Sequence, residues 1–317
     1  MNSTTKLLTS HQQDYLSTHT PFYYSPHPNL FPSFSDVYLS LAAPVLAYWI
    51  SSCFFHVLDV SDWRWLDRYR LHESAEVKSR NLVTRTEVLK AVIFQQIIQT
   101  ILGLWWMEDT ISGAGIDHVG RMAAMLPGLT NILKRVLGDS LAASCLENYG
   151  SQLLYTMYWW AIPIAKFFLG MFIIDTWQYF LHRGMHMNTY LYKKLHSVHH
   201  RLYVPYAFGA LYNHPVEGFL LDTLGAVIAE SIAHMSVREA MLLFTISSFK
   251  TVDDHCGYCL PWDPLQMFSG NTADYHDIHH QIIGIKSNFS QPFFVHWDVL
   301  LGTRMTREDI AARRRRD

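Results

Sequence analysis

The chain has few charged residues and few cysteines. Only 16% of its 317 residues are charged, whereas half are hydrophobic. A typical soluble domain has about 25% charged residues, so this balance favours a membrane protein. The four cysteines show no pattern of a disulfide framework. The pair Cys256-x-x-Cys259 lacks the second such pair that a four-cysteine zinc site needs.

Several common binding motifs are missing as well. The sequence contains no glycine-rich nucleotide pattern, no internal repeat and no basic face suited to nucleic acid. Electrons for a redox reaction would therefore have to come from another protein. Residues 1–36 are polar and rich in proline, without the apolar core of a cleavable signal peptide. We expect the first apolar run to direct membrane insertion.

Three apolar runs, 37–58, 88–106 and 153–174, are long enough to cross a bilayer, which takes about 20 residues. Buried helices of a soluble protein are the alternative, but these runs are long and unusually aromatic. The apolar segments 219–235 and 240–249 are shorter or interrupted by acidic residues. We expect them to form a hairpin that dips into the membrane.

The distribution of basic residues assigns sides to these spans. The connection 59–87 carries six lysines and arginines, whereas 107–152 carries three. The positive-inside rule places the first connection in the cytosol, and the third span then returns the chain to the cytosol before His182. We expect four segments: a polar N-terminal segment (1–36), transmembrane helices and loops (37–174), a histidine-rich catalytic domain (175–306) and a basic tail (307–317).

Histidines are concentrated in the second half of the chain. Eleven of the eighteen lie between His182 and His280. Eight of these form three short boxes: His182 and His186; His196, His199 and His200; His276, His279 and His280. Neutral imidazole binds transition metals, and one zinc ion needs only about four ligands. The boxes therefore predict two metal ions. Without cysteine ligands, two redox-active metals suggest oxygen chemistry on iron.

Further residues are candidates for the site. His255 is a candidate ninth ligand and His214 a less certain tenth, whereas His234 lies on an apolar segment and is expected to pack. Four carboxylates are candidates for hydrogen bonds to the outer nitrogen of ligand imidazoles: Asp175, Asp253, Asp254 and Asp277. For Asp175, an interaction with Arg183 or water is equally compatible. Polar residues near the last box, Asn271, Lys286 and Asn288, are candidates for substrate binding.

The boxes, together with Asp253-Asp254-His255-Cys256-Gly257-Tyr258 and the segment from Asn288 to Phe294, resemble the fatty acid hydroxylase superfamily of membrane enzymes. The resemblance covers about 175–305. Within that superfamily, 276–281 and 284–292 are most similar to the sphinganine 4-hydroxylase branch. The superfamily's ligand roles carry over onto the eight box histidines.

The resemblance implies an all-α integral membrane protein with a cytosolic histidine-rich cap that holds two metals. It implies a di-iron, O2-dependent hydroxylase of the endoplasmic reticulum that acts at carbon 4 of sphinganine or dihydroceramide. Electrons would come from NAD(P)H through an external cytochrome b5 and its reductase, and zinc can replace iron in a purified sample. Two alternatives remain open: a sterol desaturase or methyl oxidase of the same superfamily, and a membrane zinc-binding or transport protein.

Overall fold

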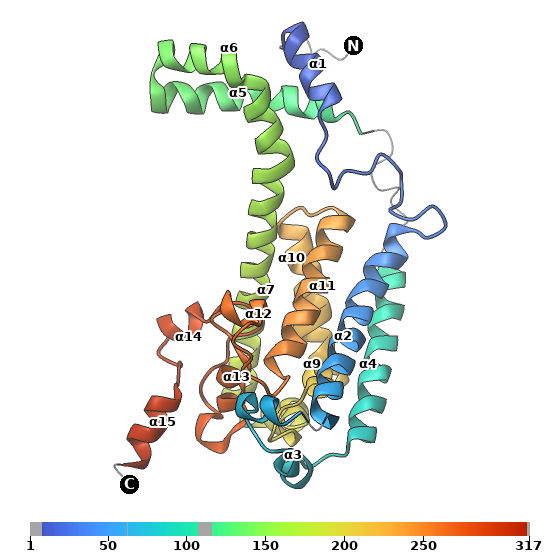
Figure 1. The fold of residues 1–317 in the computed structure, drawn as a ribbon, viewed down its shortest axis with the longest axis vertical. Coiled ribbons are helices and arrows are strands. Elements are labelled where there is room, and N and C mark those ends of the chain that lie inside the picture. Colours follow the sequence, from blue (N-terminus) through green and yellow to red (C-terminus); the bar gives the residue numbers. More distant parts are fainter. Residues whose placement is uncertain (1–7, 62, 107–115, 316–317) are drawn as a thin grey trace. The chain divides into compact units, whose positions relative to one another are not determined.

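The computed structural model describes residues 8–61, 63–106 and 116–315. Within these ranges the chain forms helices and loops, with only isolated bridges Phe31↔Phe34 and Arg70↔Tyr258 and no β-strand. The predicted all-α class is therefore confirmed (Figure 1). The chain divides into two compact units, Met1–Asp36 with Thr110–Phe168, and Val37–Asp109 with Leu169–Asp317.

Three helical stretches are long and apolar enough to cross a membrane. They are α2 (Asp36–Val60), α4 (Arg85–Trp106) and the stretch Asp139–Met187, which joins α6 (Asp139–Thr156), the π-turn η3 (Met157–Ala161) and α7 (Ile162–Met187). Only 33%, 22% and 17% of their most apolar windows are buried inside the protein. Large apolar side chains such as Phe54, Ile97 and Phe168 remain exposed, as lipid contact requires.

The first unit contains α1 (Ser10–Thr18), α5 (His118–Leu137), α6 and the start of α7. Leu16, Met122, Ala123 and Leu154 are buried in its core. The helix α1 begins with a capping box in which Thr9 and Gln12 exchange hydrogen bonds. The side chain of Gln12 also donates to the backbone carbonyl of Leu146, which holds the short α1 against α6.

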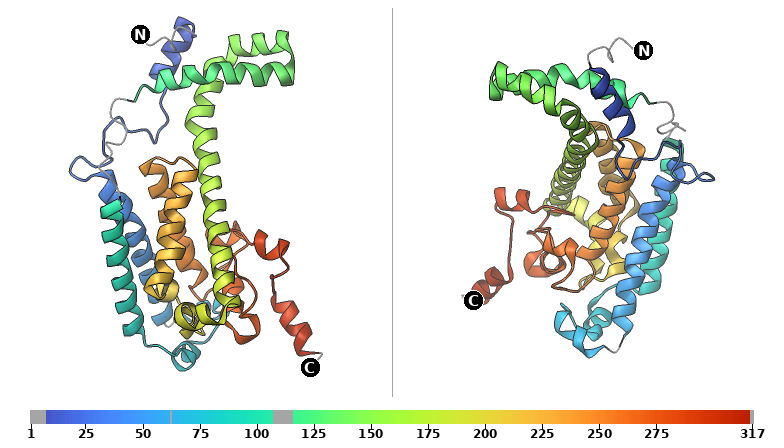
Figure 2. Two further views of the ribbon diagram at one scale, coloured as in Figure 1. Left: turned by 180° about the vertical axis from the view of Figure 1, so that it is seen from behind. Right: turned by 45° about the horizontal axis from the view of Figure 1, so that its top comes forward.

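The second unit contains the histidine boxes. In it α2 lies beside α4, and α10 (Leu224–Ile232) lies beside α11 (Val237–Asp254), as both views of Figure 2 show. The helices α9 (Pro215–Gly218) and α10 are joined without a break by the π-turn η7 (Phe219–Thr223). The expected hairpin is thus present as α10, a short turn and α11. The turn contains His234 at a positive φ of 50°.

Short elements complete the second unit and connect its boxes. They are η2 (Arg64–Tyr69), α3 (Ser74–Arg80), α8 (Thr189–Leu191), η4 (Tyr192–His196), η5 (His199–Arg201), η6 (Ala207–Leu211), α12 (Pro264–Met267), α13 (Ala273–His280), η8 (Ile282–Gly284), α14 (His296–Leu300) and α15 (Arg307–Arg314).

The loop between α2 and α4 packs against the histidine-bearing segment. The backbone N–H of Leu71 donates to Gly257 at 2.9 Å, and the N–H of Cys259 donates to Tyr69 at 2.8 Å. Nε2 of His72 lies 2.7 Å from Oδ1 of Asp277. This loop and the boxes therefore lie on the same side of the spans. All four cysteines are free, and Cys256 is buried in this packing.

Candidate metal centre

The histidines reach one site from several elements. The helix α7 continues past the expected end of its span, because no helix breaker intervenes, and carries His182 and His186 one turn apart. The second box lies on the short turns η4 and η5. The third box occupies the last turns of the eight-residue helix α13. The imidazole of His255 comes from the residue that caps the C-terminus of α11.

These side chains form two groups of ligand-capable nitrogens. In each group, one ring nitrogen from every member lies within 4.8 Å of the others. The first group is His182, His186, His196, His200 and His279; the second is His199, His255, His276 and His280. Adjacent histidines of one box thus face different groups: His199 and His200 diverge, as do His279 and His280. All nine are buried except the partly buried His200.

Hydrogen bonds at Nδ1 fix the orientation of most rings. The Nδ1 atoms of five imidazoles donate to backbone carbonyls at 2.7–3.1 Å: His182 to Phe289, His199 to Tyr212, His255 to Thr251, His279 to Ser287 and His280 to Leu202. A carbonyl oxygen can only accept, so Nδ1 carries the proton. The lone pair of each neutral ring is then on Nε2, which points into the site.

The Nε2 atoms face one another without protons between them. Nε2 of His182 lies 3.0 Å from Nε2 of His196, although both rings use their protons at Nδ1. Nε2 of His199 lies 3.5 Å from Nε2 of His255. Nε2 of His279 is buried and has no hydrogen-bond partner. Facing lone pairs repel, so this arrangement fits a cation between the rings.

Protonation does not relieve that repulsion at neutral pH. Burial lowers the pKa of His199 to about 3 and that of His255 to about 4. These imidazoles therefore stay neutral and keep their lone pairs available. Five nitrogens in one group and four in the other, without a thiolate, are compatible with two metal ions of the kind that imidazole prefers.

The four predicted carboxylates have other partners. Asp175 accepts the backbone N–H groups of Phe293 and Phe294. Asp253 and Asp254 both pair with the buried Lys250, and Asp277 accepts from His72 and Arg307. In the described part of the chain, none of the four bonds to an imidazole of the two groups. In this structure, backbone carbonyls, which a sequence does not single out, accept the Nδ1 protons of five of these rings.

Among the residues that the structure describes, Glu217 is the one carboxylate that contacts an imidazole of the groups. Its Oε1 lies 2.5 Å from Nδ1 of His196, and both side chains are buried. Its Oε2 is buried without a partner. Glu217 is not among the residues that the sequence motifs single out; its signal is an acidic residue two positions after His214-Pro215, at the start of an apolar stretch.

His214 belongs to neither group. It is the N-cap residue of α9, where its Nδ1 accepts the N–H of Val216 at 3.2 Å. The proline that follows cannot donate a backbone hydrogen bond and begins the helix, so a capping role fits this position. The structure thus separates His214 from the nine clustered histidines.

The predicted substrate-binding residues are not brought together. The amide of Asn271 bonds to Asp254 and to the carbonyl of Pro292. Asn288 has a positive φ of 54° and is bound to the backbone of Tyr275 and Met305. Both are fully buried by these structural contacts. Lys286 is exposed at the edge of a mainly apolar groove that also includes His186, His200 and His280.

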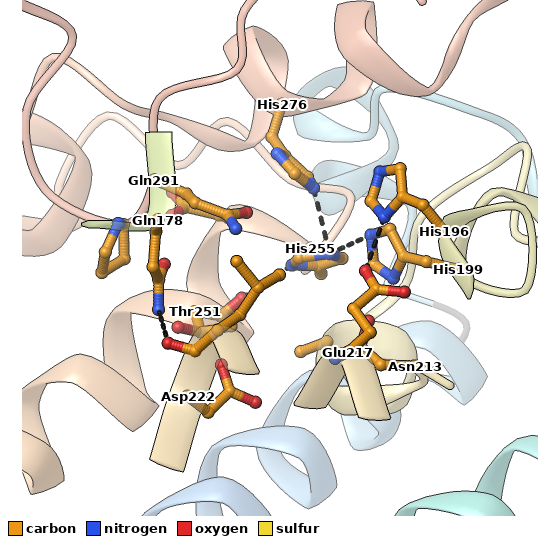
Figure 3. Close-up of a pocket in the computed structure, with 14 residues that line it drawn as sticks. Gln178, His196, His199, Asn213, Glu217, Asp222, Thr251, His255, His276 and Gln291 are labelled. Atoms are coloured by element: carbon orange, nitrogen blue, oxygen red, sulfur yellow. Dashed lines mark hydrogen bonds and ion pairs between the residues drawn. The ribbon is translucent and has the colours of Figure 1, made fainter. Parts of the chain in front are cut away.

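A second cavity beside the histidines has a polar lining. His196, His199, His255 and His276 form one wall (Figure 3). The remaining lining contains seven polar or acidic side chains that lie outside the boxes: Gln178, Asn213, Glu217, Asp222, Thr251, Asp254 and Gln291. These residues come from α7, α9, η7, α11 and the loops that follow η6 and precede α14.

Comparison with known proteins assigns the family. Residues 167–303 match the model of the fatty acid hydroxylase family. The chain is 49% identical over 281 residues to sphingolipid C4-hydroxylase SUR2 of Saccharomyces cerevisiae, covering 88% of this chain and 74% of that protein. It is 41% identical over 269 residues to sphinganine C4-monooxygenase 2 of Arabidopsis thaliana, covering 85% of this chain and 88% of that protein.

Other relatives carry different names. The chain is 40% identical over 272 residues to very-long-chain aldehyde decarbonylase GL1-9 of Oryza sativa subsp. indica, covering 86% of this chain and 90% of that protein. Methylsterol monooxygenase erg25A of Aspergillus fumigatus is 35% identical, but over only 44% of this chain and 46% of its own. No solved structure matches. Since the histidine groups lie inside the matched segment and close relatives align over most of both chains, the chain belongs to the fatty acid hydroxylase family.

Proposed function

We propose that this protein is a membrane-bound, O2-dependent hydroxylase that adds a hydroxyl group at carbon 4 of sphinganine or dihydroceramide. The observation that carries the proposal is the pair of histidine groups whose bare Nε2 atoms face one another, within a chain 49% identical to a sphingolipid C4-hydroxylase. The product would be a phytosphingosine-type base.

The nine clustered histidines would hold two iron ions. Bound iron supplies the activation of O2 that an unactivated methylene requires. The residues of the chain orient and shield that chemistry. Backbone carbonyls and Glu217 fix the ring orientations, and burial of the rings excludes bulk water from the metal-facing nitrogens. A sample purified without added iron would also accept zinc, because zinc binds the same imidazole nitrogens.

The electrons would come from outside the chain. No flavin, nicotinamide or haem motif is present in the sequence, so we assign electron supply to cytochrome b5 and its reductase, driven by NAD(P)H. We place the enzyme in the endoplasmic reticulum membrane with the boxes toward the cytosol. The basic loop between α2 and α4, which packs on the histidine-bearing segment, supports this orientation.

A lipid analysis tests the proposal. We expect expression in cells that lack C4-hydroxylase activity to restore 4-hydroxylated long-chain bases, measured by mass spectrometry after hydrolysis. The His279→Ala variant serves as the matched inactive control. Sterols and long-chain aldehydes are measured in the same extracts. A change in sterol intermediates or aldehydes, with the bases still lacking the third hydroxyl, would assign the reaction to one of the other relatives.

A further inference from the structure

An acidic residue interrupts the apolar stretch that leads into the α10–α11 hairpin. Asp222 lies in the π-turn η7 and lines the cavity beside the histidine groups. Glu217, one turn earlier, lines the same cavity; in the view of Figure 3 its carboxylate lies beside His196, and Asp222 lies below His255. A π-turn widens a helix locally and occurs frequently at functional sites. The metal-facing histidines leave the role of Asp222 unexplained.

The surrounding helices hold Asp222 in place. Gln95, from the spanning helix α4, donates from Nε2 to Oδ2 of Asp222 at 3.3 Å. Its amide occupies the space beside Gly218, where the Cβ of any other residue would lie 2.5 Å from the amide atoms. Gly218 thus permits this close approach between α4 and α9. A polar side chain within a spanning helix is costly unless it has such a partner.

The hydrogen-bond donors beside Asp222, the side chains of Gln95 and Gln99, are neutral amides. No lysine, arginine or histidine forms an ion pair with Asp222 in the part of the chain that the structure describes. Burial raises the pKa of Asp222 to about 7, which reflects a carboxylate removed from water without a cation beside it. The Oε2 atom of Glu217 is also buried and unpartnered. A ligand with a positive charge and several donors would satisfy this lining.

Amide groups complete the polar surface. The side chains of Asn213 and Gln291 line the cavity, and neither forms a hydrogen bond within the described ranges. Each amide can both donate and accept, which suits a hydroxyl group. The cavity therefore combines three carboxylates with two free amides, next to the imidazoles of His199 and His255. The carboxylate of Asp254 pairs with Lys250, which leaves those of Asp222 and Glu217 for a ligand.

The chemistry of the reaction requires such a surface. In a long-chain base, carbon 4 is separated by two carbon–carbon bonds from the carbon that carries the amine, and it adjoins a carbon that carries a hydroxyl. The polar head must therefore enter the site together with the reacting carbon. Resting on the function proposed above, we propose that this cavity binds the amino-alcohol head of a free long-chain base. Asp222 and Oε2 of Glu217 face the ammonium group, and Asn213 and Gln291 bind the hydroxyls.

The assignment separates the role of Asp222 from that of the metal ligands. Among the described residues, Asp222 forms no hydrogen bond with any of the nine clustered histidines. Replacement by asparagine keeps the shape and removes the charge. Glu230→Gln is the matched control, because Glu230 lies on the same continuous helix but outside the cavity lining.

The test compares the two variants and the wild type in isolated membranes on two substrates: sphinganine and the corresponding 1,3-diol without the amine. We expect Asp222→Asn to raise the KM for sphinganine by at least about tenfold, the effect of one lost charge partner. Metal content and the KM for the diol should match the wild type, and Glu230→Gln should match it on both substrates. An equal KM change on both substrates, or none, would overturn the inference.

The wild-type protein supplies a second measurement that does not depend on the variant's folding. It should prefer sphinganine over the diol by at least about tenfold in kcat/KM; equal use of both would reject amine recognition. Failure of the wild type to hydroxylate either sphinganine or dihydroceramide would instead reject the proposed function, whereas hydroxylation of dihydroceramide alone would reject only the assignment of the cavity to a free base. A wild type that hydroxylates sphinganine, with an Asp222→Asn variant indistinguishable from it, would reject the head-binding assignment alone.

Discussion

Removal of the negative charge of Glu217 should weaken one metal site and spare the other. Glu217 contacts His196, a member of the five-histidine group, and no member of the four-histidine group in the described residues. In Glu217→Gln, the amide oxygen can still accept the Nδ1 proton of His196, so the ring keeps its orientation and loses only the stabilising charge. In Glu217→Ala, the buried donor has no acceptor left.

The expected size follows from the geometry. Oε1 of Glu217 lies 2.5 Å from Nδ1 of His196, and these two side chains are only 1% and 2% exposed, respectively. A hydrogen bond to a charged group contributes about 1.5–3 kcal/mol. Loss of an orienting partner of a ligand histidine typically costs about 10- to 100-fold in metal affinity. These ranges agree, since tenfold equals about 1.4 kcal/mol. We expect the metal affinity of this site to fall by about tenfold in Glu217→Gln and by up to about 100-fold in Glu217→Ala.

A chelator titration of the purified protein measures this effect as metal ions retained per chain. The wild type should lose both ions over one range of chelator concentration. Glu217→Gln should lose one ion at a concentration about tenfold lower and retain the other as the wild type does. The Glu230→Gln variant is the control and should follow the wild type. Loss of both ions from Glu217→Gln at the wild-type concentration would refute the stabilising role of the Glu217 charge.

Three further predictions concern the ligands, the packing and the topology. The variants His199→Ala and His279→Ala should abolish hydroxylation and lower the number of metal ions bound per chain, because each removes a buried Nε2 from one group. The control His234→Asn should keep its activity. Full activity of either alanine variant would contradict the two-metal cage. Gly284→Ala should destabilise the protein by about 1–3 kcal/mol, since its Cβ would lie 1.9 Å from the carbonyl oxygen of Ile278 on the box-bearing α13. Thermal unfolding checks this against Gly128→Ala, where a Cβ meets nothing within 4 Å. A glycosylation acceptor engineered near Lys78 should remain unmodified, and its modification would reverse the proposed orientation.

The sequence predicts local features of this protein well. Apolar runs of bilayer length identify the three spans, because hydrophobicity and helix length depend on neighbouring residues alone. Spacing within a box indicates which histidines share a helical face: His182 and His186 lie four apart and belong to one group, whereas His199 and His200 are adjacent and belong to different groups. The resemblance to the family also follows from contiguous motifs.

Roles that depend on distant segments could not be read in the same way. Asp175 and Asn288 carry polar groups near the boxes, but each is used to hold a backbone segment far away in the sequence. The carbonyls of Phe289, Tyr212 and Ser287, which orient ligand rings, belong to residues whose side chains give no sign of it. Every residue has a backbone carbonyl, so only the tertiary structure selects the acceptors.

Glu217 and Asp222 show the same division. From the sequence, each is an acidic residue at the edge of an apolar stretch. In the fold, α9 places Glu217 against His196, and the π-turn η7 places Asp222 beside Gln95 of α4, more than a hundred residues earlier in the chain. The sequence by itself determined the spans and the local pairing of the histidines. Only the tertiary structure decided which carboxylate supports a ligand and which lines the cavity, because these contacts join segments that the chain keeps far apart.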